Sequence, residues 1–230
     1  MINQVFIFSA GAGTRMAPLT KDAPKPLLKV GKKAILDHIL DRIRFLKVPN
    51  VIINTFYLKK KIKDFAYKHK DNLIISDEFT KVETGGGIKY AIKSGLIDIN
   101  KPLMLINGDL FWKEDEDFLT DMIKKFNLEK PDILLSLTDR RKYFGYRGEG
   151  DFNLLHSGKV IKDAKNPYAF TGVQIINPKI FNKAPKENRF SISHFYHNKS
   201  LKINGIVSKN DFFHIGDVDA LEEINTDYHL

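Results

Sequence analysis

Two cationic side chains and a pair of glycines lie close together near the start of the chain, and together they suggest a phosphate site. The segment Gly11-Ala12-Gly13-Thr14-Arg15 follows a short apolar run, and Lys25 stands between two prolines ten residues further on. Glycine lets backbone N–H groups approach phosphate oxygens because no side chain intervenes. The prolines fix the lysine at low entropic cost. Two fixed cations suit a polyphosphate whose negative charge grows during a reaction.

A lone Gly-x-Gly is more often a plain turn, so the wider pattern around it matters. A dinucleotide fingerprint would place a third glycine where this chain has Met16, and it would begin a helix that Pro18 disfavours. A Walker A loop would need Gly-Lys-Ser/Thr after four residues, which this run lacks. The complete run Gly-x-Gly-Thr-Arg-Met-x-Pro-Leu-Thr, followed by Pro-Lys-Pro, is more specific and indicates a different phosphate loop.

A carboxylate follows another apolar run, at Asn107-Gly108-Asp109. Taken alone, this tripeptide is typical of a turn. If the run before it is a strand of a parallel sheet, however, Asp109 lies at the carboxyl edge, where ligands bind in such folds. Magnesium prefers oxygen ligands and uses few protein carboxylates. Asp109 is therefore a candidate Mg²⁺ ligand.

The elements that must position these groups alternate along the first half of the chain. Short apolar runs predict strands, and apolar stripes at helical spacing predict helices. The predicted strands are Val5–Ser9, Val51–Thr55, Leu73–Ser76, Leu103–Ile106 and Ile133–Thr138, and the predicted helices are Ala34–Leu46, Leu58–Lys68, Gly87–Ser94 and Asp115–Phe126. This order predicts an α/β fold, with a Rossmann-like, mainly parallel sheet and helices on both faces.

The pattern changes after Asp139, where strands follow one another with few helices between them. Arg140–Gly150 is polar and predicts a loop or short hairpin. The predicted strands beyond it are Phe152–Leu155, Val160–Ile161, Ala169–Asn177 and Leu201–Val207. We expect a small antiparallel extension here that covers one side of the cleft. No linker rich in Pro, Gly or Ser divides the chain, so residues 1–230 are expected to form a single domain.

The stretch from Phe8 to Val30 resembles the signature of sugar-phosphate nucleotidyltransferases, and the resemblance covers nearly the whole chain. Val82-Glu83-Thr84-Gly85-Gly86-Gly87-Ile88 is similar to a nucleobase loop, and Ile106–Asp109 to a metal-binding strand end. Gly148–Phe152 and Phe170–Gln174 are similar to acceptor-side segments. The pattern is closest to the uridylyltransferases that act on N-acetylmuramic acid 1-phosphate.

The resemblance implies attack of a sugar 1-phosphate on the α-phosphorus of a nucleoside triphosphate, with pyrophosphate leaving. UTP and an N-acetylmuramic or related amino-sugar 1-phosphate are the expected partners, with Mg²⁺ as the cofactor and Mn²⁺ as an alternative. Residues 1–139 would form the nucleotide-binding half, and residues 140–230 the sugar-phosphate-binding half. A guanylyl-, cytidylyl- or thymidylyltransferase for another sugar phosphate stays open, as does a catalytically weak regulatory paralogue that binds nucleotide.

The resemblance implies a role for each residue that stands at a matching position of the family's motifs. Arg15 and Lys25 are the expected catalytic cations. The expected nucleotide-binding residues are Ala10, Gly11, Gly13, Thr14, Glu83, Thr84, Gly85 and Asn107, and the expected sugar-phosphate residues are Asp151, Lys165, Thr171 and Gly172. Two alternatives stay open here. The Glu83–Gly87 run also fits a helix N-terminus entered through glycines, with Glu83 binding base, ribose or nothing, and Lys165 is equally consistent with a solvated lysine.

One departure from the family concerns the second metal ligand near the C-terminus. The family closes its site with a pattern such as Trp-x-Asp-x-Gly-Thr, whereas this chain has Phe212-Phe213-His214-Ile215-Gly216-Asp217. His214 therefore stands at the metal-ligand position, and imidazole suits Zn, Mn or Co better than Mg²⁺. Asp217 could reach the metal instead, or only cap the next helix. A third alternative is that the second contact is lost.

The composition limits the remaining function classes. Thirty lysines and seven arginines face 28 acidic residues, which gives a formal net charge of +9. This excess fits either a lysine-biased surface or an anionic partner, but no nucleic-acid motif accompanies it, so no nucleic acid is expected. Cysteine is absent, which excludes disulfides and fits a cytoplasmic address. The chain shows no membrane-length apolar run and no signal peptide at its start, and a monomer or small homo-oligomer is expected.

Overall fold

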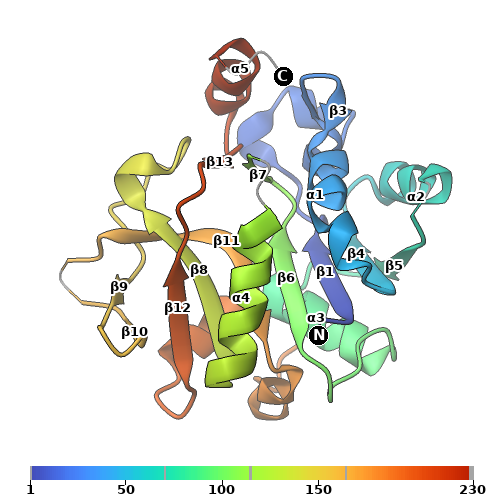
Figure 1. The fold of residues 1–230 in the computed structure, drawn as a ribbon. Helices are drawn as coiled ribbons and strands as arrows, with labels where there is room; N and C mark the ends of the chain where they lie inside the picture. The colour runs from blue at the N-terminus through green and yellow to red at the C-terminus, as the bar shows by residue number, and fades with distance from the viewer. Residues whose placement is uncertain (1, 70, 114–115, 164, 228–230) are drawn as a thin grey trace.

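A computed structural model describes residues 2–69, 71–113, 116–163 and 165–227. Within these residues the central sheet has seven strands, in the order β12 (Ile203–Val207), β8 (Ile133–Asp139), β11 (Tyr168–Ile176), β6 (Leu103–Asn107), β1 (Gln4–Phe8), β4 (Asn50–Thr55) and β5 (Leu73–Asp77) (Figure 1). Strand β11 runs antiparallel to both of its neighbours, and the other neighbouring pairs are parallel.

Helices cover both faces of this sheet, as the alternating pattern predicted. One face packs against α1 (Ile35–Ile43), α2 (Lys59–Lys68) and α4 (Glu116–Glu129). The other face packs against α3 (Glu83–Lys93) and the 3₁₀ segments Pro178–Lys183 and Ile192–His197. In Figure 1, α4 lies in front of the sheet and α3 behind it. No helix in the described part of the chain is both long and apolar enough to cross a membrane.

Two separate hydrophobic cores follow from the alternation of side chains along the strands. In β1, Val5 and Ile7 point into the core on the α1 side, whereas Phe6 points into the core on the α3 side. Helix α1 buries Ile35 and Ile39 completely, which is the stripe expected from the sequence. The predicted helix over Asp115–Phe126 corresponds to α4, and Asp115 itself lies outside the described residues.

The second half of the chain contributes more to the central sheet than the sequence suggested. The predicted strands Ala169–Asn177 and Leu201–Val207 become β11 and β12 of the main sheet. Strand β11 is almost completely buried, and a strand with apolar side chains on both faces is stable inside a sheet. The small antiparallel extension consists of β9 (Asn153–Leu154) and β10 (Val160–Ile161).

The order of the strands creates a crevice beside β1. The chain runs from β1 to β4 and β5 on one side, and then crosses to β6 on the other side of β1. Ligands bind at such switch points, outside the carboxyl ends of the strands. A second short pair, β7 (Leu110–Trp112) with β13 (Phe212–His214), brings the C-terminal segment beside the end of β6. The Rossmann-like fold class is therefore confirmed.

Candidate active site

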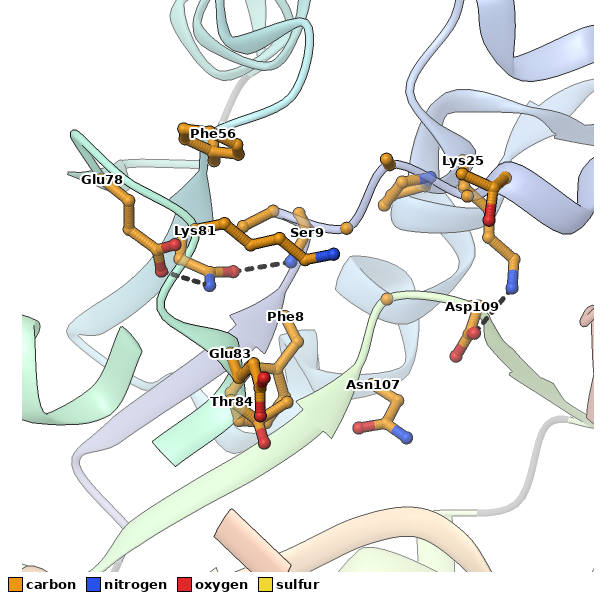
Figure 2. A pocket seen from close by; sticks show the side chains of 18 of the residues that line it. Phe8, Ser9, Lys25, Phe56, Glu78, Lys81, Glu83, Thr84, Asn107 and Asp109 are labelled. Atoms are coloured by element: carbon orange, nitrogen blue, oxygen red, sulfur yellow. Dashed lines mark hydrogen bonds and ion pairs between the residues drawn. The ribbon is translucent and has the colours of Figure 1, made fainter. Parts of the chain in front are cut away.

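A cavity of about 430 Å³ opens at the carboxyl ends of β1, β4 and β6. Most of the residues singled out in the sequence line it: Ala10, Gly11, Gly13, Thr14, Arg15, Lys25, Glu83, Thr84, Asn107 and Asp109. Figure 2 shows Lys25 and Asp109 at one end of this cavity, and Phe56 and Glu78 at the other. The cavity thus has a charged end beside the glycine loop and a second end beside the segment that enters α3.

The two glycines of the loop have different structural reasons to be glycine. Gly13 has a φ of +60°, and a Cβ there would lie 3.0 Å from Thr20 and 3.1 Å from Lys25. Its carbonyl accepts the N–H of Met16 at 2.8 Å, which begins a 3₁₀ turn. At Gly11 a Cβ would meet no atom within 4 Å. Gly13 therefore shapes the loop, whereas Gly11 leaves open space that a ligand can occupy.

Lys25 and Asp109 form a largely buried ion pair at the charged end of the cavity. The lysine Nζ lies 2.7 Å from Asp109 Oδ2, and Lys25 is only 8% exposed. Lys25 begins a 3₁₀ turn between its prolines, and Pro26 packs against Gly108. Burial tends to raise the pKa of Asp109, but the positive charge of Lys25 and the nearby His214 hold it below its usual value. Asp109 is therefore an ionised carboxylate at neutral pH.

His214 lies beside Asp109 because β13 pairs with β7. His214 is opposite Leu110 in this pair, and the N–H of Ile215 donates to the backbone oxygen of Asp109 at 3.0 Å. Burial lowers the pKa of His214 below its ordinary value, although Asp109 acts in the opposite direction. The imidazole is therefore neutral at pH 7 and has a nitrogen lone pair to offer.

Asp217 has a structural role at the start of α5 (Val218–Asp227). Its Oδ1 accepts the N–H of Ala220 at 2.9 Å, which is the geometry of a helix N-cap. Among the residues that the structure describes, no group of three His, Asp or Glu side chains could hold a metal by itself. A metal here would rely on Asp109 and His214 together with ligands from outside the protein.

The glycine triplet lies in the first turns of α3, as the helix N-terminus alternative predicted, and a segment from the far end of the sequence holds it. Gly86 donates its N–H to the carbonyl of Phe190 at 3.0 Å, and Thr84 Oγ1 accepts the N–H of Ile192 at 2.9 Å. A Cβ on Gly85 would lie 2.4 Å from the Phe190 ring. Thr84 lines the cavity, but Gly85 faces Phe190 and is not among the lining residues. Close packing against this segment is thus one reason for the glycine triplet.

Glu83 enters α3 in an unusual backbone conformation. Its φ is +63°, and its Oε1 lies 3.1 Å from Nε of Arg189. Left-handed backbone is uncommon for residues other than glycine and is found where the surroundings enforce it. The side chain of Glu83 lies at the edge of the cavity.

Asn54 and Glu78 also line the cavity, and the sequence analysis missed both of them. Asn54 Oδ1 accepts the N–H of Ser9 at 2.6 Å, and Asn54 Nδ2 donates to Glu78 Oε1 at 2.7 Å. Burial raises the pKa of Glu78 to about 7, and the hydrogen bond from Asn54 opposes part of this shift. A polar residue near the end of the predicted strand Val51–Thr55 was the available signal, because that end lies at the ligand-binding edge.

The four predicted sugar-phosphate residues are not among those lining the cavity. Asp151 Oδ2 accepts the N–H of Phe170 at 2.8 Å, and the buried Thr171 hydroxyl donates to the carbonyl of Ser136 at 3.3 Å. Gly172 has a φ of +96° at a bulge in β11, and a Cβ there would lie 3.1 Å from the Asn107 amide. Lys165 is exposed. Asp151, Thr171 and Gly172 thus shape the wall beside the cavity through the backbone of β11.

The fold and the cleft define an α/β protein with a glycine loop that lines a cavity at a topological switch point. The family described as Nucleotidyl transferase matches residues 4–229 of the chain. An N-acetylmuramate alpha-1-phosphate uridylyltransferase from Caulobacter vibrioides is 31% identical over 226 residues, covering 93% of this chain and 92% of the relative. The chain belongs to the nucleotidyl transferase family, as the resemblance in its sequence predicted.

Other relatives differ in the substrates that their names state. A D-glycero-alpha-D-manno-heptose 1-phosphate guanylyltransferase from Campylobacter jejuni is 26% identical, covering 93% of this chain and 94% of the relative. The crystal structure of HddC from Yersinia pseudotuberculosis superimposes with a TM-score of 0.80 at 22% identity, and the match covers 99% of this chain and 100% of the other. A UDP-glucose pyrophosphorylase complexed with UDP-glucose has a TM-score of 0.80 at 20% identity, with coverages of 100% and 99%. These structures establish the fold.

Proposed function

We propose that the protein joins UTP to N-acetylmuramic acid 1-phosphate or a related amino-sugar 1-phosphate, releasing pyrophosphate. An oxygen of the sugar phosphate attacks the α-phosphorus of the triphosphate and forms a new P–O bond. The bond from the α-phosphorus to the oxygen that bridges to the β-phosphate breaks, and pyrophosphate leaves with the electron pair. The uridylyltransferase named above, with its near full-length match, supports this choice of substrates.

The observation that carries the proposal is the buried ion pair of Lys25 and Asp109 beside an open glycine loop. The attacking group is already an anion, so little general-base help is required. The protein must instead bring two anions together and offset their repulsion. Lys25 and Arg15 supply positive charge at the charged end of the cavity, and the open space at Gly11 admits phosphate oxygens near the loop backbone.

The rest of the cavity suits the base and ribose. If the phosphates lie against the glycine loop, the base extends toward Thr84 and Glu78, which line the other end. In this proposal residues 1–139 supply mainly the nucleotide site, and residues 140–230 supply mainly the sugar-phosphate site. Gly172 lies beside Asn107, and Asp151 holds the neighbouring Phe170, so in this proposal the acceptor phosphate approaches from the side of β11.

The donor set fits a divalent ion held by few protein ligands. Asp109 would hold Mg²⁺ through its carboxylate, and His214 would provide a neutral nitrogen. Magnesium commonly binds through one or two carboxylates together with substrate phosphates and water, so this sparse set is compatible with it. Because His214 offers a nitrogen ligand, Mn²⁺ is the alternative to Mg²⁺ at this position. When bound, such an ion neutralises charge on the phosphates.

Pyrophosphate release tests the proposal directly. UTP, GTP, CTP and dTTP would each be combined with N-acetylmuramic acid 1-phosphate, N-acetylglucosamine 1-phosphate and a heptose 1-phosphate, first with Mg²⁺ and then with Mn²⁺. We expect UTP with an amino-sugar 1-phosphate to give the highest rate. Preferred turnover of GTP with the heptose phosphate would instead match the guanylyltransferase relative.

A second candidate function follows from His214 at the metal-ligand position. With one carboxylate near the phosphates, the protein could bind nucleotide but turn it over slowly, and so act as a regulatory paralogue. This candidate predicts measurable binding of a nucleoside triphosphate without pyrophosphate release from any pair. Both proposals predict nucleotide binding, but only the main proposal predicts turnover. Nucleotide binding and pyrophosphate release must therefore both be measured.

A further inference from the structure

The loop after β8 carries one arginine, Arg147, whose single side-chain contact among the described residues is a long ion pair. Resting on the proposed function, we propose that Arg147 determines acceptor specificity by binding a carboxylate on the sugar of the sugar 1-phosphate. N-acetylmuramic acid differs from N-acetylglucosamine by a lactyl ether that ends in a carboxylate. An enzyme that distinguishes the two must therefore place a cation where that carboxylate lies.

Three arginines lie in the segment that follows β8, and two of them have firm partners. Arg140 donates to the carbonyl of Glu149, and Arg141 donates to both carboxylate oxygens of Asp139. Arg147 is 66% exposed and makes no side-chain hydrogen bond in the described part of the chain; its closest ion-pair contact is 3.8 Å from Nε to Oδ2 of Asp217. That distance is too long for a hydrogen bond, so its donors are free for a ligand.

Two aromatic residues fix the loop that carries Arg147. The buried Tyr143 donates its hydroxyl to the carbonyl of Thr171 at 2.9 Å, and its ring stacks on Tyr146 with centroids 5.5 Å apart. Gly150 donates its N–H to the Tyr146 hydroxyl at 3.2 Å. These contacts connect the loop to the bulge in β11, which forms the predicted acceptor wall.

The same loop also lies along β13, beside the charged end of the cavity. Phe144 exchanges backbone hydrogen bonds with this strand, donating to Phe212 at 3.0 Å and accepting from His214 at 2.9 Å. Gly145 is close enough that a Cβ would clash with the carbonyl of His214. Gly216 lines the cavity, and Asp217 next to it contacts Arg147. Arg147 does not line the cavity itself, but its contact residue Asp217 directly follows Gly216, which does.

Arginine suits this role because its planar guanidinium can bind a carboxylate through two parallel hydrogen bonds. A ligand carboxylate would replace a long contact to Asp217, whose other oxygen is committed to capping α5. The exchange leaves that cap intact. The substrate class that fits is thus a sugar 1-phosphate that carries a second anionic group.

The experiment compares N-acetylmuramic acid 1-phosphate with N-acetylglucosamine 1-phosphate in the full-length protein with UTP. The wild-type protein should favour the acidic sugar in kcat/KM by at least about tenfold, the size expected for a charge-assisted hydrogen bond. Arg147→Gln should raise KM for the acidic sugar by about that factor and change KM for the neutral sugar by less than about twofold. Arg147→Lys should give an intermediate effect, because lysine keeps the charge but loses the fork geometry.

Arg141→Gln is the matched control, because it removes an exposed arginine of the same segment that already has a partner. It should leave the preference between the two sugars unchanged. Equal use of both sugars by the wild type, or an equal rise of both KM values in Arg147→Gln, would overturn the proposal while leaving the nucleotidyltransferase function standing.

A binding measurement separates this inference from the proposed function if turnover is absent. Calorimetric titration of each sugar 1-phosphate into protein with Mg²⁺ and a non-hydrolysable UTP analogue does not require catalysis. Tighter binding of the acidic sugar that depends on Arg147 and weakens with added salt supports the inference. Binding that Arg147→Gln does not change refutes it, whatever the rate of pyrophosphate release.

Discussion

Glu78 accepts a hydrogen bond from Asn54, and this buried bond of 2.7 Å connects the segment after β5 to the end of β4. The Asn54 amide uses its other end to accept the N–H of Ser9 at 2.6 Å, so a single side chain fixes the first residue of the loop. Gly87 permits this arrangement, because a Cβ there would lie 2.6 Å from Glu78 Oε1. The start of the glycine loop is therefore positioned by residues from β4 and from the segment after β5.

The raised pKa of Glu78 makes stability depend on pH in a defined direction. The folded protein holds the Glu78 proton up to about pH 7, whereas its ordinary pKa is 4.5. The native state therefore binds more protons than the unfolded state between these values, and its stability falls as pH rises through that range. Glu78→Gln removes this dependence. As the pH rises from 4 to 8, the unfolding free energy of the wild type should therefore fall relative to that of the variant, by up to about 3 kcal/mol.

Denaturant titrations of both proteins at several pH values measure this difference. Glutamine can still accept the Asn54 hydrogen bond, so the variant should fold. The exposed Glu149→Gln is a suitable control and should show a constant offset from wild type. A constant offset for Glu78→Gln as well would mean that the Glu78 carboxyl titrates at its ordinary pKa.

Lys25→Ala should lower turnover by at least about two orders of magnitude, the size typical of losing a transition-state electrostatic contact. The variant also leaves the buried Asp109 carboxylate without its cation. Steady-state pyrophosphate release measures the loss, and circular dichroism checks that the fold is retained. Lys32→Ala removes an exposed lysine a few residues away and should keep a near-normal rate. A near-normal rate in Lys25→Ala would rule out its catalytic role.

His214→Asp tests the second metal position. If His214 binds the ion, the carboxylate should preserve or raise the Mg²⁺-supported rate and reduce the relative advantage of Mn²⁺, because magnesium prefers oxygen ligands. Rates measured across a series of Mg²⁺ and Mn²⁺ concentrations check this expectation. His156→Asp, at an exposed position, serves as the control. A collapse of the rate with both ions would point to a specific role of the imidazole.

Two glycine substitutions should distinguish a glycine that close packing requires from a glycine that leaves space for a ligand. Alanine inside a helix is ordinarily more stable than glycine by about 1 kcal/mol, but a Cβ on Gly86 would lie 2.2 Å from the carbonyl of Asn188. Gly86→Ala should therefore destabilise the fold by at least about 1 kcal/mol. Gly11→Ala should change stability by less than about 0.5 kcal/mol, since no atom lies within 4 Å.

Binding distinguishes the two glycine variants further. The methyl group of Gly11→Ala would occupy space expected to receive a phosphate, so its affinity for UTP should fall at least about tenfold. Fluorescence-monitored unfolding and equilibrium titration give the two quantities. Unchanged UTP affinity in Gly11→Ala would mean that the nucleotide does not approach this part of the loop.

The sequence predicted the elements whose signals are local. The strand at Val5–Ser9, the amphipathic stripe of α1 and the strand end at Asp109 each follow from periodicity over a few residues. The glycine loop was recognisable because its residue types and spacing resemble a family signature, and the backbone geometry requires a glycine at Gly13. These local signals were enough to predict the fold class and the family.

Contacts between distant segments could not be predicted in the same way. Nothing local to Ala169–Asn177 distinguishes a strand in a small extension from one inserted between β6 and β8. Glu78 follows its strand by one residue and looks like a solvated acid until the chain folds over it. Gly85 and Gly86 are explained by Phe190 and Asn188, about a hundred residues away.

The attachment of residues 82–87 to residues 188–192 has a consequence for synthesis of the protein. The loop emerges from the ribosome long before the segment that holds it, and β11, which separates β6 from β8, also follows later in the chain. A nascent chain of the first 139 residues therefore lacks both the strand that lies between β6 and β8 and the segment that holds residues 82–87 in place. Capture on an immobilised nucleotide would accordingly select complete, folded chains over truncated ones.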